Sequence, residues 1–203
     1  MKIQFIYSHL NGLEWLLHHH NDLWLEIQDS IKGVDSSKCR TKTSKEKTMK
    51  GKVLFSPIEM NSQMKKEFES RGWSEERYTY YVTNDHKLTR HIVNLPSYKQ
   101  KQFIEEAGAT PIPSYHQTDF VKNRVSVEVQ FGKYPFIEFD LFVKHLGFFI
   151  GDNIDLGIEI IPTKLLQGQM SSGPGYYERT LSHILRQGRG NPSVPLIIIG
   201  VEP

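Results

Sequence analysis

The stretch that decides the fold is Val125-Ser126-Val127-Glu128-Val129-Gln130-Phe131, in which apolar and polar side chains alternate. Alternation among β-branched residues predicts a half-buried strand, with the valines and Phe131 on one face and the polar side chains on the other. Residues 114–121 are also strand-like. The two runs form an antiparallel hairpin if Lys122-Asn123 is a tight turn.

Helices and further strands are predicted on both sides of this hairpin. Helical spacing or helix-start signals cover residues 13–31, 62–71, 97–109, 136–148 and 176–187, and strand-like runs cover residues 154–162 and 196–201. Strands that alternate with helices predict an α/β or α+β fold with a central mixed β-sheet flanked by helices. A chain of 203 residues fits one domain, so we expect residues 1–203 to form a single unit.

Composition excludes several classes of protein. A hydrophobic content of 38% is too high for a disordered chain. No run approaches the roughly 18 apolar residues of a membrane span, and the first residues lack the pattern of a secretory signal. The single cysteine, Cys39, cannot form an intrachain disulfide or a structural zinc site. We therefore expect a soluble, cytoplasmic protein with no membrane partner.

Positive charge is concentrated in one segment. Residues 38–52 hold seven of the 25 basic residues and one of the 23 acidic residues, which leaves 18 basic and 22 acidic residues elsewhere. Clustered lysine and arginine suit a polyanion, because their binding releases phosphate counterions. A solvated flexible loop over residues 33–53 is the alternative, and composition favours it.

Two acids on the predicted hairpin could share a cation. With the turn at Lys122-Asn123, Asp119 lies opposite Ser126 and Glu128 is a diagonal neighbour about 7–8 Å away. Carboxylates at this spacing can both bind one hard cation, whose distance to its oxygen ligands is about 2.1 Å. A solvated polar face on an ordinary hairpin is the simpler alternative.

The order of these parts resembles the PD, spacer, D/E-x-K motif of a large nuclease superfamily. Residues 127–136, Val-Glu-Val-Gln-Phe-Gly-Lys-Tyr-Pro-Phe, are more specifically similar to type II restriction endonucleases related to BglII and BamHI. Tyr176-Tyr177-Glu178, Phe55-Ser56-Pro57 and Trp73 add to the resemblance, which covers about residues 55–178. It implies a restriction-endonuclease-like fold and Mg²⁺-dependent hydrolysis of double-stranded DNA.

The resemblance also assigns roles. Asp119 would bridge the metal and the scissile phosphate, Glu128 would bind the metal, and Val129 would bind it through its carbonyl oxygen. Alignment on Trp73 places Glu75 near the metal and the nucleophile, although an exposed structural acid is the alternative. Gln130 replaces the lysine of the motif, and an amide can orient a water but cannot take its proton. We therefore expect Mg²⁺ to activate the water, with Glu75 or a phosphate oxygen receiving the proton.

DNA recognition is expected from two loops beside this strand. Lys133 is placed to read guanine in the major groove. The segment 169–175 holds Ser171 and Ser172, whose hydroxyls suit a degenerate purine/pyrimidine position, with helix capping as the alternative. The resemblance implies a palindromic site containing GATC (purine-GATC-pyrimidine), cut after its first base to leave four-base 5′ overhangs with 5′-phosphates. It also implies a companion DNA methyltransferase in the host.

A palindrome is matched most simply by a twofold homodimer. The helix at residues 136–148 is a candidate interface because it is apolar on several sides, although burial in the core could explain the same pattern.

Three alternative functions remain: a nuclease of the superfamily without site specificity, a DNA-binding protein without catalysis, and a structural domain. The sequence also leaves open whether one or two metal ions take part.

Overall fold

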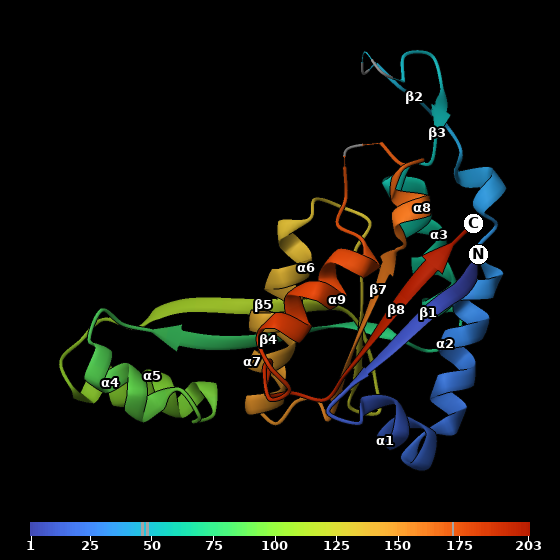
Figure 1. Cartoon of the computed structure of the whole chain (residues 1–203). Helices are drawn as coiled ribbons and strands as arrows, with labels where there is room; N and C mark the ends of the chain where they lie inside the picture. Colours follow the sequence, from blue (N-terminus) through green and yellow to red (C-terminus); the bar gives the residue numbers. More distant parts are fainter. Residues whose placement is uncertain (46, 48, 172) are drawn as a thin grey trace.

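The computed structural model describes residues 1–45, 47, 49–171 and 173–203. The hairpin predicted from the sequence lies inside a six-stranded mixed sheet with the order β1-β8-β7-β6-β5-β4 (Figure 1). Strands β6, β7 and β8 are parallel to one another, whereas β5, β4 and β1 pair antiparallel to their neighbours. The strands are β1 (Lys2–His9), β4 (Ser74–Val82), β5 (Ile112–Lys122), β6 (Val125–Val129), β7 (Leu156–Pro162) and β8 (Leu196–Glu202).

Helices cover both faces of the sheet, as the sequence predicted. The larger core packs the valines of β6 and the isoleucines of β7 and β8 against α2 (Asn21–Gly33) and α3 (Pro57–Glu69). The smaller core packs Leu196 and Ile198 against α6 (Pro135–Phe139) and α9 (Tyr177–Arg186). The other helices are α1 (Gly12–His19), α4 (His86–Ile92), α5 (Ser97–Glu106), the π-helix η2 (Asp140–Lys144), α7 (His145–Ile150) and α8 (Lys164–Gln167).

The predicted turn of the central hairpin was wrong by one residue. Asn123 and Arg124 both have positive φ, 47° and 65°, as a two-residue type I′ turn requires. Val121 therefore pairs with Ser126, whereas a turn at Lys122-Asn123 would place Asp119 opposite that serine. The change of register moves Asp119 towards Glu128 and Val129.

Several other boundaries differ from the prediction. The expected helix at residues 13–31 is broken at His20 into α1 and α2, and the expected helix at residues 136–148 runs through α6, η2 and α7. Strands β1 and β4 were not predicted. The expected loop at residues 33–53 contains a 3₁₀ turn, η1 (Ser36–Cys39), and a small antiparallel ladder between β2 (Lys42–Thr43) and β3 (Val53–Leu54).

Two parts of the molecule project from the sheet in different directions. Strands β4 and β5 extend beyond their neighbours, and their outer ends are connected through α4 and α5. Strands β2 and β3 project from a different side of the molecule, near α3 and α8 (Figure 1). In the described part of the chain, no helix combines the length and apolar character needed to cross a bilayer.

Candidate active site

A small pocket lies between α3 and the middle of the sheet. Its lining brings together three strands and one helix: Asn61 and Lys65 from α3, Glu75 from β4, Asp119 and Phe120 from β5, and Val129 from β6. Three of the predicted site residues, Glu75, Asp119 and Val129, therefore meet here. Glu75 is far from the other two in the sequence, whereas Asp119 and Val129 lie on the two strands of one hairpin, and the pairing of β4, β5 and β6 brings all three together.

Asp119 is an exposed carboxylate held at a fixed place in this pocket. Its Oδ2 accepts a hydrogen bond from the backbone N–H of Val129 at 3.1 Å. The paired register of β5 and β6 runs from Lys122 and Val125 to Phe120 and Val127, so this side chain continues the contact between the strands just beyond it. One carboxylate oxygen is thereby oriented by the backbone, and the other stays available to the pocket.

Glu75 also lines the pocket and is exposed. Its Oε1 accepts from Lys65 Nζ at 2.7 Å, and its Oε2 accepts from Gln117 Nε2 at 3.1 Å. The Lys65 ammonium lowers the pKa of the Glu75 carboxyl. A lowered pKa makes this group a weaker base, so displacement of Lys65 would be needed for it to accept a proton readily.

Glu128 differs from the other two acids because it is buried. Its Oε2 lies 2.9 Å from Lys144 Nζ, and the same ammonium lies 2.7 Å from Asp140 Oδ1. Burial raises the pKa of Glu128 to about 8, since desolvation outweighs the attraction of Lys144, and Asp119 and Asp140 raise it further. Its Oε1 is buried and accepts no hydrogen bond of ordinary geometry from the described residues.

Gln130 is held by hydrogen bonds at both ends of its amide. Its Nε2 donates to Asp140 Oδ2 at 3.2 Å, and its Oε1 accepts from the backbone N–H of Gly132 at 2.9 Å. A Cβ at Gly132 would lie 2.6 Å from that oxygen, so any larger residue there would displace the Gln130 amide from this position. In this arrangement Gln130 braces the end of β6 against η2.

The predicted DNA-reading residues lie on two neighbouring segments. Exposed Lys133 forms an isolated antiparallel bridge with Pro174, which brings the turn after β6 against the segment 168–175. Ser171 is 9% exposed, and its N–H donates to the carbonyl of Phe55 at 3.3 Å. Ser172 lies outside the described residues. Helix α9 begins only at Tyr177, with Tyr176 as its N-cap, so Ser171 does not cap it.

Four residues near the site were missed from the sequence. Asn61 and Lys65 line the pocket, and Asp140 and Lys144 join Glu128 and Gln130 in the buried layer. The spacing of Asp140 and Lys144, four residues apart on a helix, was a usable signal for an ion pair. It was overlooked because the surrounding residues were interpreted only as an apolar helix.

The residues present can accommodate a divalent cation. Carboxylate and carbonyl oxygens are the ligands that Mg²⁺ prefers, and it commonly uses one or two carboxylates together with water and phosphate oxygens. Asp119 supplies an accessible oxygen, Val129 lies beside it, and Glu128 Oε1 is an acceptor that no described residue satisfies. Within the described chain, no three acidic, histidine or cysteine side chains converge to form a complete metal shell. Water and phosphate oxygens would supply the remaining ligands.

The chain is similar to known proteins in both sequence and structure. The family model described as restriction endonuclease BglII/BglIII matches residues 5–201. A crystal structure of restriction endonuclease BglII complexed with a DNA 16-mer is similar with a TM-score of 0.61 and 22% identity, covering 98% of this chain and 76% of that one. Free BglII is similar with a TM-score of 0.59 and 19% identity, covering 100% and 80%. No curated protein matched in a sequence search.

The structural similarity, at these identities, establishes the fold, whereas the match to the family model extends over nearly the whole chain. This family generally uses divalent metal ions, in keeping with the oxygen-rich pocket. The chain therefore belongs to the BglII/BglIII restriction endonuclease family and is a site-specific deoxyribonuclease of type II.

Proposed function

We propose that this enzyme cleaves double-stranded DNA in the presence of Mg²⁺ at a palindrome containing GATC, in the form purine-GATC-pyrimidine. The cut follows the first base and leaves four-base 5′ overhangs with 5′-phosphates. This finer specificity is that of BstYI, a relative of BglII and BamHI, which the sequence resembles in its length and whole pattern, whereas residues 127–136 and Tyr176-Tyr177-Glu178 resemble BglII.

The meeting of distant residues in one pocket supports the catalytic part of the proposal. Glu75, Asp119 and Val129 line this pocket, and Glu128 lies in the layer behind it on the same strand as Val129. We assign Asp119, Glu128 and the Val129 carbonyl as the metal-holding groups, and Glu75 as a group that orients or accepts a proton from the attacking water. When bound, the divalent ion would supply Lewis-acid stabilisation of the charge that develops on the phosphate.

The residues of the chain have separate tasks in this scheme. Asp119, oriented by the Val129 N–H, would hold the divalent cation at the open side of the pocket, where the scissile phosphate would approach. Gln130 holds the end of β6 through Asp140 and does not itself exchange a proton. Lys133 and Ser171, with Ser172, are assigned to base recognition. Their two segments are joined by the bridge between Lys133 and Pro174.

We propose a homodimer in which each subunit cuts one strand. Leu141 and Phe148 of the predicted interface helix are buried in the core, so they cannot serve this purpose. Phe136, Phe139 and Val143 are 53%, 42% and 42% exposed and follow one another at helical spacing. An apolar stripe of this kind on a helix is suited to a partner subunit.

We treat residues 1–203 as one nuclease domain that acts in the bacterial cytoplasm, with a companion methyltransferase protecting host DNA. The test is digestion of unmethylated plasmid DNA with Mg²⁺, followed by sequencing of the cut ends. Ends that all fall within purine-GATC-pyrimidine support the proposal. Ends at another palindrome would correct the specificity, random ends would remove site recognition, and intact plasmid in both Mg²⁺ and Mn²⁺ would contradict catalysis.

A further inference from the structure

A basic hairpin projects from the molecule beside the loop that holds the candidate recognition residues. The basic hairpin is residues 40–52, which include β2 and end directly before β3. Its exposed cations are Arg40, Lys42, Lys45, Lys47, Lys50 and Lys52. Within the described residues, none of the six forms an ion pair, whereas the preceding lysine, Lys38, is paired with Asp35.

The base of the hairpin is firmly attached. Beyond the β2–β3 ladder, Ser44 N–H donates to the Lys52 carbonyl at 2.9 Å and Gly51 N–H donates to the Ser44 carbonyl at 3.0 Å. Phe55, directly after β3, donates to the Gln169 carbonyl at 2.9 Å and accepts from Ser171. Phe55, three residues after the hairpin, therefore ties this part of the chain to Gln169 and Ser171.

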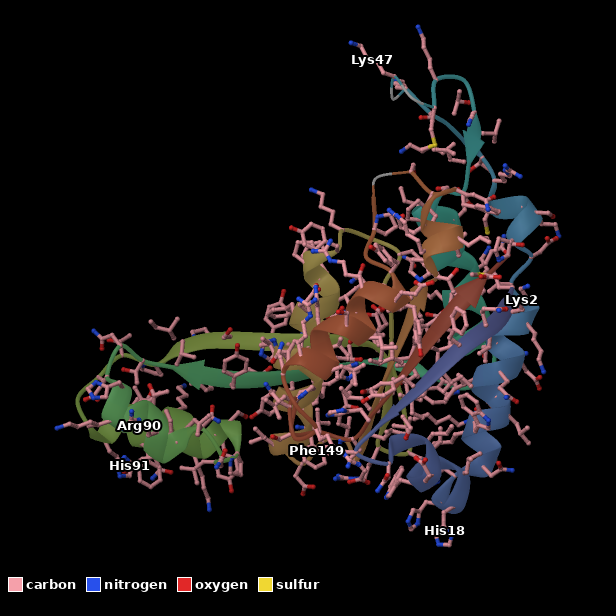
Figure 2. The ribbon with its side chains drawn as sticks, in the orientation of Figure 1. Lys2, His18, Lys47, Arg90, His91 and Phe149 are labelled. Atoms are coloured by element: carbon pink, nitrogen blue, oxygen red, sulfur yellow. The ribbon has the colours of Figure 1, made fainter. Side chains whose placement is uncertain are left out.

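The hairpin also leads directly into the helix that lines the pocket. Helix α3 begins at Pro57, so Asn61 and Lys65 lie only about 6 and 12 Å along it, at about 1.5 Å per residue. In Figure 1 the β2–β3 segment rises from the end of the molecule where α3 and α8 lie. Figure 2 shows Lys47 near the tip, directed away from the rest of the protein.

We propose that the basic hairpin binds the phosphate backbone of the DNA that flanks the recognised sequence. The inference rests on the proposed function, because it assumes that the enzyme holds duplex DNA across the pocket. Lysine ammonium groups bind phosphates as mobile point charges. Contacts to phosphates hold the DNA in place but do not depend on its sequence. The hairpin projects away from the body of the molecule, whereas Lys133 and Ser171 lie on segments that are bridged to Pro174 and to Phe55.

The spacing of the cations suits this partner. The basic residues of the hairpin recur at every second or third position of the sequence: Arg40, Lys42, Lys45, Lys47, Lys50 and Lys52. Phosphates along one strand of B-DNA advance by about 3.4 Å of helix axis, so several of these cations can meet neighbouring phosphates.

The opposite end of the molecule offers a matched control. Lys87, Lys99 and Lys101 are exposed on α4 and α5, which lie far from the hairpin in Figure 1. Figure 2 marks the same region by Arg90 and His91. Substitution of these three lysines changes the net charge by the same amount as substitution of three hairpin lysines.

The test compares Lys42→Gln/Lys45→Gln/Lys47→Gln with Lys87→Gln/Lys99→Gln/Lys101→Gln in the full-length protein. Affinity for a 30-base-pair duplex and a 10-base-pair duplex, each with the site at its centre, is measured in Ca²⁺ over a series of salt concentrations. The slope of log affinity against log salt becomes shallower by about 0.9 for each phosphate that the protein no longer neutralises. Because the proposed homodimer carries two hairpins and so loses six lysines, we expect the slope of the hairpin variant to be shallower by about 5 on the long duplex only, and the control variant to match the wild type.

Two results would overturn the inference. One is an unchanged slope for the hairpin variant on the long duplex; loss of binding to phosphatidylserine vesicles by the same variant would then assign the charge to a membrane surface. The other is an equal reduction on both duplexes, which would place the contacts inside the recognised sequence. Plasmid cleavage by the wild type separates these failures from failure of the proposed function. A second variant, Lys45→Gln/Lys50→Gln, repeats the test if the first unfolds.

Discussion

Replacement of Lys144 by methionine tests the buried layer beneath the candidate active site. The ammonium of Lys144 lies 2.9 Å from Glu128 and 2.7 Å from Asp140, and these carboxylates are 2% and 3% exposed. Methionine keeps most of the aliphatic length but removes the charge, so both carboxylates lose their cation. Removing one partner of a buried ion pair typically costs about 3–5 kcal/mol of unfolding free energy.

The expected loss lies near the lower end of this range, about 3 kcal/mol, because an uncompensated carboxylate can take up a proton. The pKa of Glu128 is raised to about 8, so this carboxyl is mostly protonated at neutral pH and the charge that loses its cation is mainly that of Asp140. For a chain of this size, about 3 kcal/mol lowers the midpoint of thermal unfolding by about 6–12 °C. Urea unfolding followed by tryptophan fluorescence, together with calorimetry, measures both quantities.

Lys101→Met provides the control. Lys101 forms an exposed pair with Glu105 at 3.8 Å, four residues along α5, and such pairs contribute about 0.5 kcal/mol or less. Asp140→Asn combined with Lys144→Met should recover part of the loss, since one buried charge disappears with its partner. If Lys144→Met and Lys101→Met destabilise the protein equally, the buried ion pair does not stabilise the fold and the reasoning fails.

Three further predictions concern the same site. Asp119→Asn should lower Mg²⁺-dependent cleavage by about 1,000-fold or more while DNA binding in Ca²⁺ persists, because several kcal/mol of transition-state stabilisation is removed; near-normal cleavage would exclude Asp119 from catalysis. Glu75→Gln should slow single-turnover cleavage by about 100-fold if Glu75 handles a proton, and its rate should lose pH dependence. Unfolding free energy should fall by up to roughly 2 kcal/mol as pH rises from about 6.5 to 8, because the Glu128 pKa is raised to about 8 from 4.5 and the folded state binds its proton more tightly. Below pH 6.5 the buried His145, whose pKa is lowered to about 3, reduces the unfolding free energy as pH falls, so the measurement is made above that pH. Urea titrations of the wild type and of Glu128→Gln measure the effect. The same dependence of unfolding free energy on pH in both proteins would contradict it.

The central sheet could be predicted because its strands carry strong local patterns. Alternation in residues 125–131 and the apolar run at 196–201 indicate β6 and β8 without reference to the rest of the chain. Strand β4 was missed although residues 78–82, Tyr-Thr-Tyr-Tyr-Val, have high β-propensity, because no alternation of apolar and polar residues marks it. Its sequence, Ser-Glu-Glu-Arg-Tyr-Thr-Tyr-Tyr-Val, places charged and aromatic residues on an edge strand, where only pairing with β5 selects the extended form.

The error in the hairpin turn has a tertiary cause. Arg124 adopts a left-handed conformation that usually favours glycine or asparagine, so the local sequence gave no reason to place the turn there. Its guanidinium is bound by Asp155 at 2.8 Å and by Asp152 at 2.6 Å, both from the segment before β7. Contacts from 28 and 31 residues away therefore accompany the unusual conformation and fix the register.

The candidate site was predicted in part for a similar reason. Asp119 and Glu128 were identifiable from their order and from the resemblance to a known motif. Lys65, which pairs with Glu75, and Lys144, which pairs with Glu128, come from helices whose sequences suggest only a solvated face or an apolar core. Which cation meets which acid depends on how the helices pack on the sheet, and sequence spacing does not contain that information.

The pairing of β1 with β8 has a practical consequence for protein engineering. Lys2 lies opposite Glu202, and their side chains form an ion pair at 3.3 Å, so residues 1 and 203 are neighbours in space. A short linker could close the backbone into a ring, and the ring could be reopened in the exposed connection between α4 and α5. Such a circular permutant would carry its new ends, and any fused reporter, beside α4 and α5 at the outer end of β4 and β5.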